Sequence, residues 1–185
     1  MSSLDNKQKI LWITRTAVFI ALLIVLQATT AMLGNTLITG ACVNLMLIMS
    51  VMTCGLGSGL TVAAVSPVMA KLIGIGPLWS LIPFMLAGNI TLVLLWHLIG
   101  HRKIGKNQYV AYITALVVAA VTKFLVLYFG IVRIAVPLLL SLPEPQAKVI
   151  SNMFSIHQLI TASVGGAIAI VLFPKLKKAI AGRQE

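Results

Sequence analysis

A single lysine, Lys123, lies inside the apolar run Ala120–Phe129, which reads AVTKFLVLYF. An ammonium group is costly to place in lipid, so an intramembrane lysine usually faces a bundle interior or a wet cavity. The three acidic residues are Asp5, Glu144 and Glu185, and none of them lies within a long apolar run. A lysine without an acidic partner suits a small bound anion, such as a carboxylate. The alternative is that the Lys123 side chain extends its charge to the outer headgroups.

Other polar residues in or beside the apolar runs are expected to share a pocket with Lys123. Amide, hydroxyl and imidazole groups can hydrogen-bond a ligand, and a tryptophan can form its wall. The candidate ligand-binding residues are Thr39, Asn44, Lys71, Trp79, Asn89, Lys123, His157 and Gln158. Simpler interpretations stay open for each: Lys71 could reach the headgroups, and the two asparagines could only join helices. His157 could be a hydrogen-bonded core histidine.

Residues typical of catalysis do not form a known pattern. The sequence has no carboxylate pair, HExxH, P-loop or G-x-S-x-G motif, so we expect no enzyme activity, no cofactor and no ATP hydrolysis by this chain. His97 and His101 are spaced i, i+4, but no third ligand for a metal is evident. The two cysteines, Cys42 and Cys54, fit no metal motif and are expected to be small buried hydrophobic residues.

The composition indicates the solvent around these residues. The chain has 185 residues, of which 59% are hydrophobic and only 9% charged, whereas a soluble domain has about 25% charged residues. We therefore expect an integral membrane protein. The net charge of +11 could suggest nucleic-acid binding, but the basic residues cluster beside apolar runs, so no nucleic-acid partner is expected. The first apolar run lacks an A-x-A cleavage pattern and is expected to be a retained span.

Six apolar stretches come close to the roughly 20 residues that a spanning helix needs. The sequence therefore predicts one membrane domain, residues 1–185, folded as an all-α bundle of six transmembrane helices. The expected spans are 11–33, 37–54, 58–73, 78–99, 109–130 and 152–173. The second and third are short, and could be tilted or partly re-entrant. The segment 131–146 contains three prolines and is expected to be an external loop or a short interfacial helix.

Basic residues set the expected orientation. They flank the runs as Lys7, Lys9 and Arg15, then Arg102, Lys103 and Lys106, then Lys175, Lys177, Lys178 and Arg183. With six spans these clusters share one side, which the positive-inside rule assigns to the cytoplasm, together with both termini. The protein is then expected in a prokaryotic cytoplasmic membrane. Lys123 lies 14 residues beyond Tyr109, about 21 Å along the helix, which is the outer half of a core about 30 Å thick.

The candidate ligand-binding residues gather in this outer half, and the inner halves of the spans are almost free of polar groups. Residues that only join helices should be scattered over both halves. The shared depth therefore predicts a pocket that opens to the outside. The lack of an intramembrane Asp or Glu argues against transport coupled to a proton or sodium ion by this chain alone.

Span 1 contains Ala17 and Ala21, four residues apart on one helix face, where small residues let another helix approach closely. Packing within the bundle is the simpler interpretation of this pair. With its length, six spans and A-x-x-x-A pattern, the chain resembles the substrate-binding S components of energy-coupling factor (ECF) transporters. The resemblance rests on the segment RTAVFIALLIVLQ, and three further segments resemble the group with pantothenate-type members. These are TGACVNLMLIMSVMTCGLGSGL, GPLWSLIPFMLAGN and FSIHQLITASVGGAIA.

The resemblance implies a function and partners. S components bind a vitamin or related micronutrient from the outside and dock on a transmembrane T component that carries two cytoplasmic ATPases. ATP use is thought to topple the S component in the bilayer. Ala17 and Ala21 match the face that contacts the T component. Pantothenate is the expected ligand, while pyridoxine, a queuosine precursor, cobalamin and a nucleobase acid stay open.

Two functions of other classes remain as alternatives. A small membrane enzyme acting on lipid or isoprenoid substrates would carry His, Asp or Glu near the cytoplasmic face, where His97 and His101 lie without acids. A channel or exporter would need a polar stripe through the inner half of the bundle, and the sequence offers none.

Overall fold

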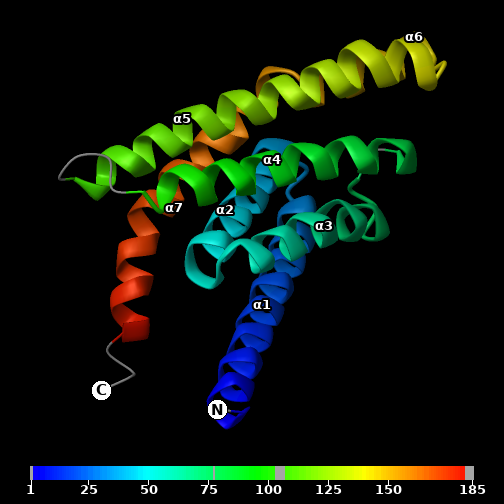
Figure 1. Ribbon diagram of the computed structural model, residues 1–185. Coiled ribbons are helices and arrows are strands. Elements are labelled where there is room, and N and C mark those ends of the chain that lie inside the picture. The colour runs from blue at the N-terminus through cyan, green and yellow to red at the C-terminus, as the bar shows by residue number, and fades with distance from the viewer. Residues whose placement is uncertain (1, 77, 103–106, 182–185) are drawn as a thin grey trace.

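The computed structural model describes residues 2–76, 78–102 and 107–181, with side chains from residue 6 to residue 179. All regular structure in these ranges is helical, which confirms the expected all-α class (Figure 1). The elements are α1 (Ser2–Ala31), α2 (Thr36–Cys54), α3 (Leu56–Leu72), η1 (Trp79–Leu81), α4 (Ile82–Gly100), α5 (Gln108–Leu127), η2 (Tyr128–Leu139), α6 (Glu144–Met153) and α7 (Ile156–Ala181). Three members of the predicted basic clusters, Lys103, Lys106 and Arg183, lie outside the described residues.

Five helical stretches are long and apolar enough to cross a membrane. They are Asn6–Ala31, Thr36–Cys54, Trp79–Gly100, Gln108–Leu139 and Glu144–Ala179. The sixth apolar helix, α3, has 17 residues and is therefore shorter than these five. It also contains Pro67. The chain therefore has the helices of a multi-pass membrane protein.

The segment after α5 differs from the prediction. Residues 131–139 were expected in a loop or interfacial helix, but α5 continues without a break into the π-helix η2, so Gln108–Leu139 forms one long rod (Figure 1). Pro137 lies inside η2, two residues before its end at Leu139, and removes one N–H from the helical hydrogen-bond pattern there. Ile131 and Ala135 are buried in an apolar cluster, and this burial favours helix over loop. Only the second part of the segment, α6, is a separate short helix.

The helix α2 lies at the centre of the bundle and contacts α1, α3, α4 and α7. A tight turn at Gly55, whose φ of 84° favours glycine, connects it to α3. Leu47, Ile48, Leu92 and Trp96 are fully buried in the main core between these helices. The core therefore fixes α2 and α4 against one another. It lies on the C-terminal side of the polar residues Asn44 on α2 and Asn89 on α4.

Residues of the 31–36 and 72–76 segments and of the junction between α6 and α7 line one cavity. This end of the bundle therefore brings together the C-terminal halves of α1, α3 and α5 and the N-terminal halves of α2, α4 and α7. These are the halves that carry most of the candidate ligand-binding residues.

The contact between α2 and α7 is close enough to be tested. A Cβ built on Gly165 would lie 2.5 Å from the carbonyl oxygen of Ala41 and 2.9 Å from the backbone nitrogen of Leu45. We predict that Gly165→Ala lowers the free energy of unfolding by about 1–3 kcal/mol, because overpacking forces the two helices apart. Thermal unfolding of the purified protein in detergent measures this loss.

The matched control is Ala167→Val, which adds volume at an exposed position of the same helix. It should leave the thermal midpoint close to that of the wild type. Equal midpoints for Gly165→Ala and the wild type would contradict the close approach of α2 and α7.

Candidate ligand-binding site

Lys123 is the centre of a buried polar cluster that joins three helices. Its side chain, on α5, is only 3% exposed. The ammonium Nζ donates one hydrogen bond to Oδ1 of Asn44 on α2, at 2.6 Å, and another to Oδ1 of Asn89 on α4, at 2.8 Å. These short, charge-assisted bonds hold three helices together at the same depth. We call Lys123, Asn44, Asn89 and Thr161 the lysine cluster.

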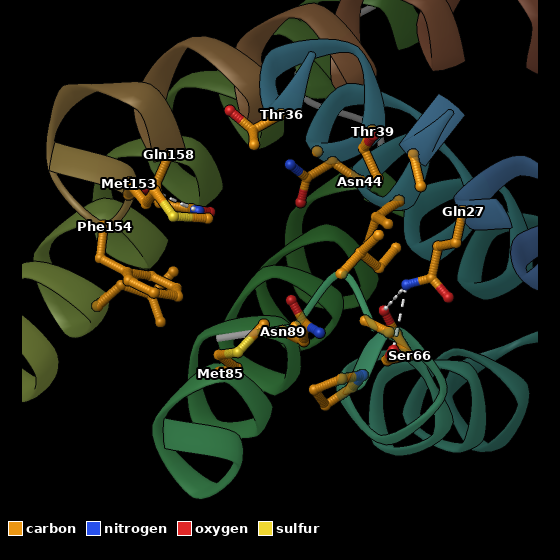
Figure 2. Close-up of a pocket in the computed structure, with 18 of the residues that line it drawn as sticks. Gln27, Thr36, Thr39, Asn44, Ser66, Met85, Asn89, Met153, Phe154 and Gln158 are labelled. Atoms are coloured by element: carbon orange, nitrogen blue, oxygen red, sulfur yellow. Dashed lines mark hydrogen bonds between the residues drawn. The ribbon is translucent and has the colours of Figure 1, made fainter. Parts of the chain in front are cut away.

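The two amide groups are oriented by further hydrogen bonds. Nδ2 of Asn44 donates to Oγ1 of Thr161 on α7, at 3.2 Å, and Thr161 in turn donates to the carbonyl oxygen of Gln158. Nδ2 of Asn89 donates to the carbonyl oxygen of Ala63 on α3, at 3.5 Å. Figure 2 shows the oxygen atoms of Asn44 and Asn89 turned toward one another across the site. Five helices therefore contribute to the position of one ammonium group.

The lysine cluster contains a charge but no counter-charge. Glu144 is the one acidic residue whose side chain the structure describes, and it pairs at 2.8 Å with Lys148 on the exposed side of α6. The asparagine oxygens offer dipoles to Lys123 and no negative charge. An ammonium has three N–H donors, and the asparagines use two of them. One donor and one uncompensated positive charge remain at this position.

A cavity of about 230 Å³ lies beside the lysine cluster. Its lining comes from α1 to α7 and their connections: Gln27, Ala31, Gly34, Asn35, Thr36, Thr39, Gly40, Val43, Asn44, Ser66, Pro67, Ala70, Ile75, Gly76, Met85, Asn89, Lys123, Leu127, Met153, Phe154 and Gln158. Figure 2 shows Met85, Met153 and Phe154 on one side of it and Gln27 with Ser66 on another. The cavity thus combines a charged group, a neutral polar corner and an apolar wall, as small-molecule sites commonly do.

The neutral polar corner is formed by Gln27 of α1 and Ser66 of α3. Gln27 is 1% exposed, and its Nε2 donates to the carbonyl oxygen of Ser66 at 3.1 Å. Its Oε1 is buried and accepts no hydrogen bond from any group that the structure describes. A buried acceptor left without a donor costs about 1–3 kcal/mol.

Five of the eight candidate ligand-binding residues line the cavity: Thr39, Asn44, Asn89, Lys123 and Gln158. The other three, Lys71, Trp79 and His157, are not among the lining residues. Trp79 is 57% exposed at the start of η1.

Ala70 and Gln158 line the cavity, whereas their sequence neighbours Lys71 and His157 do not. Consecutive helical residues point about 100° apart, which allows such a difference between neighbours.

The remaining candidate residues lie away from the cavity. Ala17 and Ala21 are exposed on α1, while Phe19 and Leu23 of the same helix are buried. The rings of His97 and His101 lie 4.9 Å apart at the opposite end of the bundle. Burial, with a smaller contribution from His97, lowers the pKa of His101. Within the described ranges, no group of three His, Cys, Asp or Glu residues could hold a metal ion.

The missing counter-charge makes a prediction about stability. Asn89→Asp keeps the shape of the side chain and places a carboxylate beside Lys123, at the position of an oxygen now 2.8 Å from Nζ. We expect the variant to be more stable than the wild type by about 2 kcal/mol, because hydrogen bonds between charged groups are stronger than bonds to a neutral amide. The measurement is thermal unfolding in detergent without added ligand.

Asn152→Asp is the control, because it adds the same charge at an exposed position of α6 that does not line the cavity. It should change the midpoint by much less. A midpoint for Asn89→Asp below that of the wild type would show that the ammonium is already compensated.

Comparison of the chain with protein-family models, with curated proteins and with solved structures found no match in any of the three. The resemblance to S components therefore stays a prediction from the sequence. What the structure shows is an all-helical chain, with five helices long and apolar enough to cross a membrane and a buried ammonium beside a cavity. The function is inferred from the chemistry of that cavity.

Proposed function

We propose that the chain is the substrate-binding S component of an ECF-type importer and that it takes up a small carboxylate from the outside. The observation that carries this proposal is Lys123, which is 3% exposed, lines the cavity and, among the described residues, is bound by two amide oxygens and no acidic group. Such a group recognises an anion by charge and by its remaining N–H donor.

The electrostatic gain is large enough to select anions. Two unit charges 4 Å apart attract one another by about 4 kcal/mol at an effective dielectric constant of about 20. A neutral ligand of the same shape would bind without this attraction. The asparagines strengthen the selection, because their Oδ1 atoms hold the ammonium in place before the ligand arrives and so reduce the cost of ordering it.

The rest of the cavity suits a short ligand that carries both polar and apolar groups. Thr39 and Gln158 line the cavity with polar side chains, and Met85, Met153 and Phe154 offer apolar contact. Pantothenate has a carboxylate, an amide, two hydroxyl groups and a branched apolar centre, and it is our best candidate. A cavity of about 230 Å³ favours pantothenate, pyridoxine or a small acid over cobalamin.

Transport requires partners in this proposal. Ala17 and Ala21 present small side chains on the exposed face of α1, next to the exposed apolar residues Val18, Leu22 and Val25. Small residues allow the close helix approach by which membrane helices associate. A transmembrane T component would pack on this face, and its two ATPases would supply the energy. The chain itself would bind and release the ligand in a cell membrane.

The first test of this function is ligand binding. A screen of vitamins and small acids by thermal shift should raise the midpoint for a carboxylate such as pantothenate, because a ligand that binds only the folded form stabilises it. In Lys123→Gln the affinity for the carboxylate should fall about 100-fold, since truncating a buried charge pair costs roughly 3 kcal/mol. The affinity for the corresponding neutral alcohol should change far less.

Two results would argue against the proposed site. If Lys123→Gln lowers the affinity for the acid and for the alcohol equally, Lys123 does not form a charge pair with the ligand carboxylate. If only cationic or neutral vitamins raise the thermal midpoint, the ligand is not a carboxylate. Lys148→Gln, on the exposed face of α6, serves as the control for the loss of one positive charge.

The second test concerns the partner. Ala17→Leu with Ala21→Leu should reduce copurification of the T component and its ATPases at least tenfold, because the larger side chains keep the partner helix at a distance. Ligand binding by the isolated variant should stay unchanged, since neither alanine lines the cavity. Ala167→Leu, at an exposed alanine of α7, is the control. Undiminished copurification of the double variant would exclude this face as the docking surface.

A further inference from the structure

The lysine cluster poses an electrostatic problem that exists whether or not an organic ligand is present. Nζ of Lys123 is buried, and its two partners are the neutral oxygens of Asn44 and Asn89. Glu144 is engaged with Lys148 on the exposed side of α6. An isolated buried charge is strongly unfavourable unless it is paired. The described side chains provide no acidic partner, so an ammonium that stays charged at this position needs its counter-ion from solution.

The surroundings of Lys123 can receive such an ion. Lys123 and both asparagines are among the residues that line the cavity of about 230 Å³, whereas a single water needs only about 10–15 Å³ of such volume. Among the described groups, Asn44 and Asn89 take two of the three N–H donors of Lys123, and the third remains for an anion. The asparagine oxygens face the ammonium and would repel additional negative charge, which favours one monovalent ion over a divalent one.

We infer that the lysine cluster binds a small monovalent inorganic anion, such as chloride, as the counter-ion of Lys123, and that an organic carboxylate must displace it. The anion site rests on the contacts of Lys123 alone. The displacement step rests on the proposed function, because it requires that the organic ligand binds through its carboxylate. Weakly hydrated anions such as bromide should bind better than fluoride, because fluoride loses more hydration on entering the cavity.

The test of the anion site needs no vitamin. The purified protein is heated in detergent at constant ionic strength while sodium fluoride is replaced stepwise by sodium bromide or chloride. For the wild type we expect the thermal midpoint to rise with the logarithm of the anion concentration, by about 3 °C at ten times the dissociation constant of the anion. Lys123→Met, which lacks the charge, and Asn89→Asp, which carries its own carboxylate, should show no such rise.

Lys148→Gln is the control, and its midpoint should respond to bromide as the wild type does. A flat wild-type midpoint would overturn the inference, and so would an equal rise in Lys123→Met and Asn89→Asp. If a variant does not fold, chloride-35 NMR on the wild type gives the same answer. Bound chloride should broaden the signal and bromide should narrow it again, whereas a linewidth equal to that of buffer would exclude the site.

A competition experiment separates this inference from the proposed function. The dissociation constant of the carboxylate found in the vitamin screen should rise about tenfold when bromide reaches ten times its own dissociation constant, as competition at one site requires. A carboxylate affinity that is the same at all bromide concentrations would overturn the displacement step and leave the proposed function intact. A bromide response without displacement by any vitamin or small acid would overturn the proposed function and leave the anion site intact.

Discussion

The buried lysine Lys123 is the constraint on which the arrangement of the cavity end of the bundle depends. Its two hydrogen bonds tie α5 to α2 and α4, and the amides that accept them reach on to α7 and α3. A charge in this position is tolerated only with well-placed hydrogen-bond partners. The helices must therefore meet at one depth and one rotation. The same requirement leaves one donor and one charge for a ligand.

The apolar part of the fold makes this arrangement possible. Leu47, Ile48, Leu92 and Trp96 form a close-packed core on the inner side of the lysine cluster and fix α2 against α4. On the outer side, η2 and α6 pack through a second apolar cluster, and Phe154 from that cluster also lines the cavity. Lys123 thus lies between two apolar layers. The amide oxygens of Asn44 and Asn89 accept its hydrogen bonds in place of bulk water.

The sequence could predict how far along its helix each polar residue lies, but not which way its side chain points around the helix axis. The position of Lys123, Asn44 and Asn89 along their helices was readable from span boundaries and a rise of about 1.5 Å per residue. Which way a residue faces depends on packing, so His157 and Gln158 were both expected in the site, and only Gln158 lines the cavity.

Gln27 carried the same signal as the asparagines, an amide within an apolar run, and should have been a candidate. Prolines were another source of difference. Pro137 suggested a loop, but burial of the residues before it favours a continued helix.

The central claim is that Lys123 holds the carboxylate of the ligand, and solid-state NMR tests it most directly. The dipolar coupling between Nζ, labelled with nitrogen-15, and the ligand carboxyl carbon, labelled with carbon-13, should give a separation of roughly 3.5 Å, as a direct hydrogen bond requires. A bound ligand without this coupling would contradict the account.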